Sequence, residues 1–164
     1  QVPVGVLGGD ALAEIQRLFA EDKPALARYN LEDCRLVVDI FEAIARSGFP
    51  IARMRLMHHY GGDDGASMAD NNSSCFNSRR IINTERLSIH SYGRAIDINP
   101  IQNPVIRDGR VRPDAGHDYL ERDPRTPGLI HDDSAVLRIF LEAGWKWGGH
   151  WENPVDYHHF FIEE

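Results

Sequence analysis

The chain has 164 residues, which is enough for one domain of ordinary size and too few for two. Hydrophobic residues make up 42% of it and charged residues 26%, a composition typical of a folded globular protein and not of a disordered one. The formal net charge of -7 argues against nucleic acid as a general partner, because phosphate binding favours a basic surface.

Two further features bear on the cellular context. No apolar run approaches the roughly 20 residues that a membrane-spanning helix needs, so we expect no membrane span. The sequence begins at Gln1 and therefore carries no information about a secretion signal. Its two cysteines, Cys34 and Cys75, could form a disulfide or remain two small unpaired side chains.

The first 48 residues carry two helical patterns. Asp10 can cap a helix with apolar residues at Leu12, Ile15, Leu18 and Phe19. After Pro24 and Tyr29-Asn30, Asn30 can cap a second helix that ends at Ser47-Gly48. Both patterns predict scaffold helices.

The second pattern has a local resemblance of its own. Residues 25–41, with Tyr29-Asn30-Leu31-Glu32-Asp33-Cys34, are similar to the third exonuclease motif of family B DNA polymerases. In that motif a Tyr and an Asp four residues later serve a two-metal nuclease site, which also needs an earlier Asp-x-Glu pair. The chain contains no such pair, so Asp33 alone cannot assemble two metals, and we interpret Tyr29 and Asp33 as residues near a helix start.

The middle of the chain gives weaker signals. Residues 51–60 alternate loosely and predict a strand with His58 and His59 at its exit, and residues 67–78 predict a polar loop. Five prolines between Pro100 and Pro127 predict an extended excursion. Residues 134–143 predict a short helix that stops at Gly144.

The most informative stretch runs from Ser88 to Asn99. Ile96 and Ile98 would share one face of a strand, which leaves Asp97 on the other face. Gly93 allows the chain to turn, so the imidazole of His90 can lie beside the Asp97 carboxylate. Such a pair suits a divalent ion such as zinc, although a hydrogen-bonded structural pair is the commoner arrangement.

A second cluster near the C-terminus, Asp156-Tyr157-His158-His159-Phe160, favours the metal interpretation. The two clusters together hold the imidazoles and carboxylates of a catalytic zinc site with an acid/base residue beside it. Strand periodicity leaves the histidine ligand open. A strand that includes Asp156 favours His158, and one that begins after Tyr157 favours His159.

These motifs resemble the zinc peptidases that cut peptidoglycan stem peptides, the D-alanyl-D-alanine carboxypeptidases and dipeptidases and the L-alanyl-D-glutamate endopeptidases. The resemblance rests on Ser88-x-His90-x-x-Gly93-x-Ala95-x-Asp97 and Asp156-x-x-His159-Phe160, and runs from about Phe49 to Ile162. It also includes Phe76-Asn77-x-Arg79 and Gly144-Trp145-x-Trp147-Gly148-Gly149-x-Trp151.

The resemblance implies a role for each site residue. One catalytic Zn²⁺ would be held by His90, Asp97 and His159, with Asp156 as acid/base residue. Arg79 would stabilise the oxyanion. The residues expected to orient a metal ligand or to contact substrate are Ser88, Tyr92 and Trp147.

The resemblance also implies an α+β fold: a single domain with a small, mostly antiparallel sheet, helices packed on one side and a zinc cleft on the other. We expect an N-terminal helical segment over residues 1–48 and a peptidase core over residues 49–164. The expected partner is peptidoglycan or its stem peptides, with no nucleic acid, acted on by a monomer in the periplasm or outside the cell. A non-catalytic wall-binding domain of the same fold is the main alternative.

Overall fold

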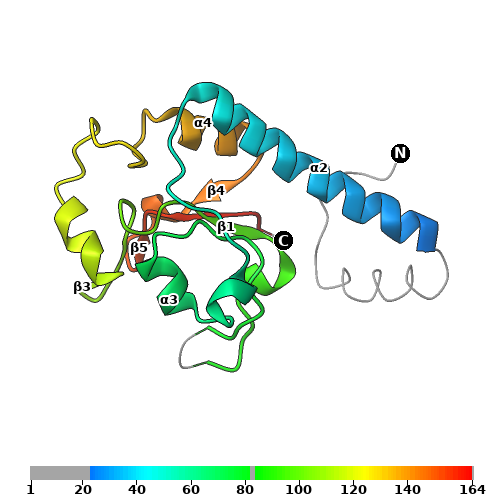
Figure 1. Cartoon of the computed structure of the whole chain (residues 1–164), viewed down its shortest axis with the longest axis horizontal. Coiled ribbons are helices and arrows are strands. Elements are labelled where there is room, and N and C mark those ends of the chain that lie inside the picture. Colours follow the sequence, from blue (N-terminus) through cyan, green and yellow to red (C-terminus); the bar gives the residue numbers. More distant parts are fainter. Residues whose placement is uncertain (1–22, 82–83, 164) are drawn as a thin grey trace. The chain divides into compact units, whose positions relative to one another are not determined.

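The structure of the chain, a computed structural model, describes residues 23–81 and 84–163 (Figure 1). Backbone contacts divide the chain into two units, residues 1–43 and residues 44–163, so the boundary expected after residue 48 stays a prediction. The helix predicted after Asp10 lies outside the described residues, as does the side chain of Cys34. Across the described part of the chain, no helix has the length and apolarity needed to cross a bilayer.

The long helix α2 spans Lys23–Ser47. It ends at Ser47 as predicted, and Gly48 follows with a φ of 73°, a conformation that glycine adopts at little cost. The predicted break at Tyr29-Asn30 is wrong, because the helix continues through both residues. A single Asn inside a helix costs only about 0.7 kcal/mol relative to Ala, which the surrounding Ala and Leu residues tolerate.

Residues 44–163 contain two small antiparallel sheets of three strands each. The first has the order β1-β6-β4, from Ala95–Asp97, His159–Phe161 and Lys146–Trp147. The second has the order β3-β2-β5, from Arg110–Arg112, Val105–Arg107 and Val155–Asp156. The predicted α+β class with a small antiparallel sheet is therefore confirmed, with the sheet divided in two.

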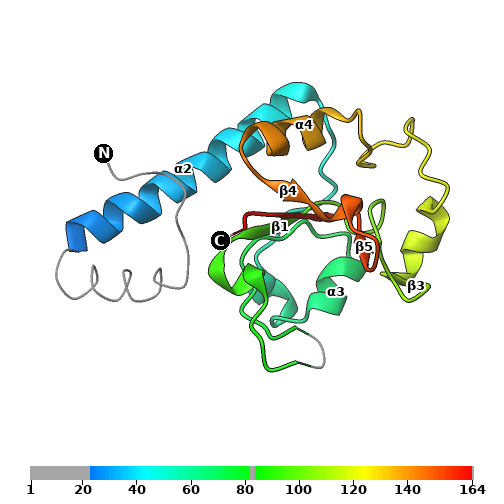
Figure 2. The same cartoon turned by 180° about the vertical axis from the view of Figure 1, so that it is seen from behind.

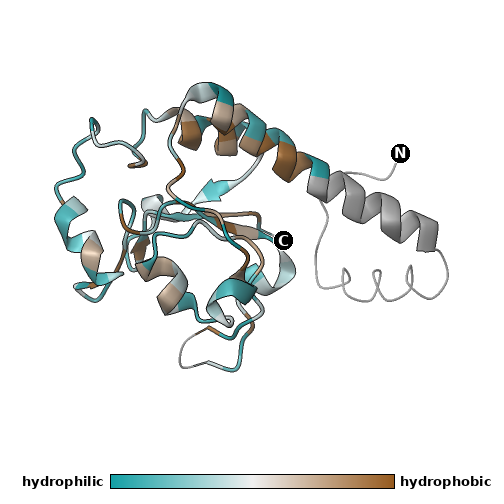
Figure 3. Cartoon of the chain, in the orientation of Figure 1, coloured by the Kyte–Doolittle hydropathy of each residue, from teal (hydrophilic) through white to brown (hydrophobic). Residues whose placement is uncertain are grey.

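The core of this unit forms where helix α4, Ala135–Glu142, packs against the first sheet. Phe140 and Phe160 are fully buried, and their rings stack with centroids 3.9 Å apart. The helix begins after Ser134, whose hydroxyl accepts from Leu137 N, and Gly144 follows it with a φ of 83°. Hydrophobic residues, brown in Figure 3, dominate α4, and Val136 and Phe140 of its apolar face are buried.

Helix α3, Asp64–Ala69, was not predicted, because residues 67–78 had been interpreted as loop. Asp63 caps it by accepting from Ala66 N, and the helix is only six residues long, too short for a periodic apolar pattern. In Figures 1 and 2, α4 lies above and α3 below the level of β1 and β4.

The strand predicted over residues 51–60 is wrong. Met54 makes only an isolated bridge to Ser73, and Met57–Tyr60 form a 3₁₀ helix on which His58 and His59 are exposed. Side chains satisfy the backbone here in place of a neighbouring strand: Arg55 N donates to Asn72 Oδ1 at 2.6 Å, and Ala52 N donates to Asn99 Oδ1 at 2.8 Å.

The excursion predicted between Pro100 and Pro127 holds more regular structure than expected. Strands β2 and β3 form a hairpin through Asp108-Gly109, both of which have positive φ. A 3₁₀ helix, Asp114–Tyr119, follows the hairpin. β2 also pairs with β5, so this hairpin carries the strand that contains Asp156.

Candidate metal centre

Asp97 and His159 face each other across a pair of strands. The antiparallel register of β1 and β6 sets Asp97 directly opposite His159, the position at which cross-strand side chains meet. His159 Nδ1 lies 2.9 Å from Asp97 Oδ1. Two residues 62 positions apart therefore become neighbours through the sheet.

His90 approaches the same carboxylate from the other edge of β1. Ser74 pairs with Asp97 there, and the carbonyl of the next residue, Cys75, lies 2.7 Å from His90 Nδ1. A carbonyl oxygen can only accept, so Nδ1 carries a proton and Nε2 is the ring nitrogen directed at the site. His90 Nε2 lies 3.2 Å from Asp97 Oδ2.

A short 3₁₀ helix, Ile89–Tyr92, holds the His90 backbone in place. Ser88 precedes it, and its hydroxyl accepts from His90 N at 3.3 Å. Gly93 ends it with a φ of 67°, which allows the chain to turn directly into β1. The predicted turn before the Asp97 strand is thus a capped 3₁₀ helix.

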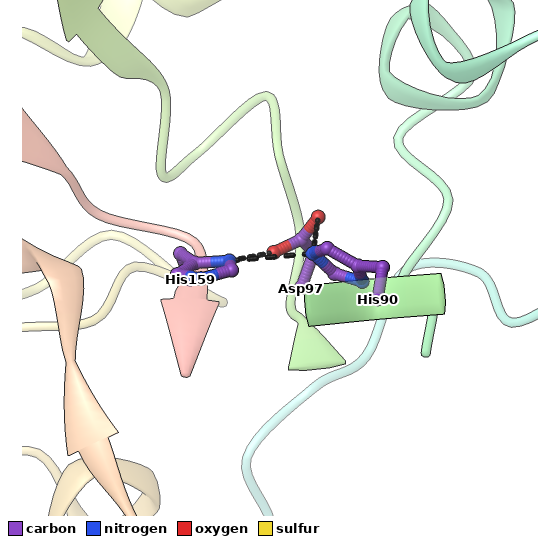
Figure 4. Close-up of side chains that lie close together, drawn as sticks. All are labelled: His90, Asp97 and His159. Carbon is purple, nitrogen blue, oxygen red and sulfur yellow. Dashed lines mark hydrogen bonds and ion pairs between the residues drawn. The ribbon is translucent and has the colours of Figure 1, made fainter. Parts of the chain in front are cut away.

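Together these three residues form a compact cluster, with His90 and His159 both directed at the Asp97 carboxylate (Figure 4). One ligand atom from each lies within 4.8 Å of the others. It is the one group of three or more metal-binding side chains within residues 23–81 and 84–163. The side chains of His90 and Asp97 are only 3% and 5% exposed.

The charges in the cluster are strongly coupled. Burial alone would raise the pKa of Asp97, but the neighbouring His90 and His158, with a hydrogen bond from His159, hold it well below its usual range. Burial lowers the pKa of His90, but the Asp97 charge and hydrogen bond outweigh it and raise that pKa above its usual value. The positive charge of Arg79 opposes this rise, so Arg79 acts on the same site.

The donor set fits a zinc ion. Two ligand atoms of a tetrahedral zinc with bonds of ~2.0–2.1 Å lie roughly 3.3 Å apart. His90 Nε2 and His159 Nδ1 are separated by 3.3 Å, which matches this spacing. Two imidazoles and one carboxylate leave a fourth position open, which is the pattern of catalytic and not of structural zinc.

Asp156 lies beside this cluster, at the end of β5. Its Oδ1 is buried and has no hydrogen-bond partner among the described residues, although His158 Nε2 lies 3.1 Å away. A buried carboxylate oxygen without a partner is costly in a purely structural position. Its side chain is 15% exposed, more than the Asp97 side chain, so it lies on the more open side of the site.

Arg79 is held near the site by an acidic partner. Its guanidinium lies 3.1 Å from Asp64 Oδ2 in the first turn of α3, and Asn77 Nδ2 donates to the other Asp64 oxygen at 3.0 Å. Arg79 Nε is buried and has no hydrogen-bond partner among the described residues. Arg80 instead pairs with Glu85 on the surface, so the two adjacent arginines have different partners.

The remaining predicted residues lie in different environments. Trp147 is buried, and its indole N–H donates to Tyr157 O at 2.9 Å, so it supports the link between β5 and β6. Tyr92 is exposed at the end of its 3₁₀ helix, and Ser88 contacts the His90 backbone. The role of each in substrate binding stays a prediction.

Sequence reasoning missed two neighbours of the cluster. The ring of Trp151 lies 5.5 Å from the His159 ring, although Trp147 had been singled out. His158 had been considered only as an alternative ligand, yet it is buried and lies between Asp156 and Asp97. The alternation of apolar and polar residues carries no signal for either contact.

The predicted cleft does not coincide with the described cavities. A cavity of about 350 Å³ lies between residues 47–50 and residues 124–135, and one of about 260 Å³ is lined by Trp147, Trp151 and Phe161. Neither is lined by His90, Asp97 or His159. The second cavity borders the cluster through Trp151, whose ring lies against His159.

Comparison with known proteins gives two separate similarities. A stretch of 32 residues is 69% identical to DNA polymerase II of Escherichia coli (strain K12). It covers 20% of this chain and 4% of the polymerase, so it is a short, partial similarity. No solved structure matches the chain.

The second similarity covers the site. Residues 82–162 match the sequence model of a family described as D-alanyl-D-alanine carboxypeptidase. The matched range includes His90, Asp97, Asp156 and His159, which the structure brings together. Residues 82–162, which contain the candidate metal site, are therefore similar to the D-alanyl-D-alanine carboxypeptidase family of peptidases.

Proposed function

We propose that this chain is a zinc metallopeptidase that hydrolyses an amide bond in the stem peptides of peptidoglycan. The observation that carries the proposal is the cluster of His90, Asp97 and His159 with the Asp156 carboxylate beside it, inside the range that matches a carboxypeptidase family. The proposal includes both D-Ala-D-Ala carboxypeptidase and L-Ala-D-Glu endopeptidase reactions, and a periplasmic or cell-wall location.

His90, Asp97 and His159 would hold the ion. Bound there, zinc would supply a Lewis acid that activates a water and polarises the scissile carbonyl. The chain prepares two of these ligands in advance. The Cys75 carbonyl fixes the tautomer of His90, and the β1–β6 register sets His159 opposite Asp97. Such outer partners orient a ligand before the ion arrives.

Asp156 would act as general base and then as general acid. It removes a proton from the attacking water and donates it to the leaving amine, so no net proton is gained or lost by the residue. Its position beside the cluster and its partly exposed side chain support this role, because a general base must reach the attacking water.

Arg79 would stabilise the negative charge that develops on the carbonyl oxygen. Its guanidinium is 27% exposed and is held by Asp64, so it combines access to substrate with a fixed orientation. Its charge acts on His90, which supports a position close to the reacting centre. A fixed cation of this kind lowers the barrier without having to reorganise.

Digestion of purified peptidoglycan tests the proposal. The wild-type chain loaded with zinc is compared with Asp156→Ala, and the products are identified by mass spectrometry. We expect one zinc per chain in both proteins and soluble products from the wild type alone. The mass released identifies the bond and so distinguishes a carboxypeptidase from an endopeptidase.

The same experiment addresses a non-catalytic wall-binding domain. Such a domain would bind zinc and sediment with peptidoglycan, but neither protein would release products. Absence of zinc from the purified wild type after loading would contradict the metallopeptidase proposal itself.

A further inference from the structure

His158 is a buried histidine for which the proposed reaction has no use. It lies between two strands of different sheets, after β5 with Asp156 and before β6 with His159. Its side chain is 4% exposed. A polar ring as buried as this one needs partners, and those partners indicate what the residue does.

The first partner of the His158 ring is Asn103, which several hydrogen bonds hold in place. His158 Nδ1 lies 2.8 Å from Asn103 O, which can only accept, so Nδ1 carries a proton and donates it. Asn103 is fully buried. Its amide donates to Ile98 O, Asn99 O and Gly128 O, and its side-chain oxygen accepts from Ile130 N and Arg122.

The backbone of the same segment is also anchored. The His158 carbonyl accepts from Ile98 N at 3.0 Å, just beyond β1. Tyr157 N donates to Pro104 O at 3.3 Å, and the Arg122 guanidinium lies 4.0 Å from the centre of the Tyr157 ring. The imidazole of His158 therefore projects from a segment that is held on both sides.

The second ring nitrogen points at the site carboxylates. His158 Nε2 lies 3.1 Å from Asp156 Oδ1 and 3.9 Å from Asp97 Oδ2. Among the described residues Asp156 Oδ1 has no partner that meets hydrogen-bond geometry, so the approach of His158 Nε2 is a contact at ion-pair distance. One imidazole thus spans the gap between the rigid Asn103 loop and the Asp156 side chain.

We propose that His158 is a positioning residue: anchored by Asn103, it holds the Asp156 carboxylate in place beside the metal centre and is not itself a metal ligand. The inference deepens the proposed peptidase function and depends on it for its kinetic effect. Misplacing a catalytic group by about 1 Å can cost roughly 100-fold in rate, so a residue that fixes one side chain has a measurable effect.

Two amide substitutions separate the two contacts of the ring. In His158→Gln the side-chain nitrogen can reach the position of Nε2 and keep the contact to Asp156. In His158→Asn it can reach only the position of Nδ1 and keep the hydrogen bond to Asn103 O. The positioning role requires the Asp156 contact, whereas a purely structural role requires the anchor.

The kinetic test uses the zinc-loaded chain and peptidoglycan stem peptide. We expect His158→Asn to lower kcat roughly 10–100-fold with KM within about twofold of the wild type, and His158→Gln to restore most of kcat. Both variants should bind one zinc. His117→Gln, the same substitution at an exposed histidine, is the control and should match the wild type.

A structural readout keeps the inference testable if no stem peptide is cut. Crystal structures of the zinc-bound proteins should show Asp156 displaced or in several rotamers in His158→Asn and unchanged in His158→Gln. An unmoved Asp156 in His158→Asn would overturn the inference, whatever the activity. Equal losses in both variants, together with lost zinc or a lowered Tm, would also overturn it, because they indicate a structural role.

Failure of the parent proposal has a different signature. An inactive wild type with Asp156 displaced only in His158→Asn would reject the peptidase function and retain the positioning contact. An active wild type with two fully active His158 variants would retain the peptidase function and reject the positioning role of His158.

Discussion

A carboxylate as buried as Asp97 is stable only because its partners offset its desolvation. In the metal-free protein these partners are imidazoles that carry protons, and a zinc ion would have to replace those protons. The cluster can therefore hold either protons or a zinc ion, and the pH sets which of the two is bound.

Zinc affinity should depend steeply on pH. Asp97 holds the pKa of His90 above the ordinary value of 6.5, so His90 keeps its proton to a higher pH than a free histidine does. A ligand must lose this proton before it binds, so affinity should fall about tenfold per pH unit for each proton released, below the raised pKa. Chelator competition at about pH 6 and about pH 8 measures this. Equal affinities at the two values would contradict it.

Arg79 and its neighbour Arg80 allow the same substitution to be compared at the site and on the surface. Arg79 contacts Asp64 near the site, whereas Arg80 pairs with Glu85 on the surface. We expect Arg79→Lys to lower kcat by roughly 100-fold, because a single ammonium cannot reproduce the planar guanidinium fork that contacts both Asp64 and an oxyanion. Arg80→Lys should have no effect on kcat. Steady-state kinetics that show equal losses for the two variants would exclude the oxyanion role.

At the candidate site, the sequence carries more signal for residue types than for their arrangement. Periodicity could not decide between His158 and His159, because Asp156 ends a strand of one sheet and His159 begins a strand of the other. No single alternation runs through both residues. The motif resemblance selected His159, and the contact between His158 and Asp156 depends on tertiary packing that neither argument contains.

At the scale of elements, Gly148 packs directly against Asp156 of β5. A Cβ on Gly148 would lie 2.8 Å from the Asp156 carbonyl oxygen and 3.1 Å from its Cβ. The 2.8 Å contact is to backbone and is shorter than a real Cβ makes, so a side chain at Gly148 requires β5 to shift. Gly148 is thus a packing requirement of this part of the site.

Gly148→Ala should therefore disable catalysis while leaving the metal ligands intact. We expect kcat to fall roughly 10–100-fold, because the Asp156 carboxylate moves with β5, and zinc content to stay at one per chain. Gly65→Ala is the control, since its nearest contacts are to side chains, at 3.3 Å and 3.7 Å, and none is to backbone. A fully active Gly148→Ala would show that Asp156 does not need its present position.

Element prediction succeeded where local signals were complete and failed where they were short. Helix α4 had an apolar face, a capping serine and a terminal glycine, and it was found. The hairpin of β2 and β3 was missed because the prolines around it dominated the interpretation. Its own signal was present in Asp108-Gly109, a pair that favours the tight turns of hairpins.

At the scale of the molecule, zinc should be a major source of stability for residues 44–163. An ion present at about 1,000 times its Kd adds about 4 kcal/mol to the free energy of unfolding, which corresponds to roughly 10 °C or more in Tm for a unit of this size. Differential scanning calorimetry with and without a chelator measures the shift. An unchanged Tm would argue against a bound ion.

The shift should be larger at about pH 8 than at about pH 6. In the metal-free protein, the raised pKa of His90 adds stability below its unfolded value of 6.5, and this stability is lost as pH rises through the raised pKa. The depressed pKa of Asp97 adds stability above its unfolded value of 3.8, which is lost only in strong acid. Zinc affinity therefore rises over the same pH range in which the protonated His90 stops stabilising the metal-free protein.

The division of the fold into two sheets has one more consequence. The first sheet supplies Asp97 and His159, the second supplies Asp156, and only Tyr157 and His158 separate Asp156 from His159 along the chain. In the proposed mechanism, capture of the ion and transfer of the proton would thus depend on different sheets. A change that slides one part against the other would give a protein that passes every test of metal content and fails only in the chemical step.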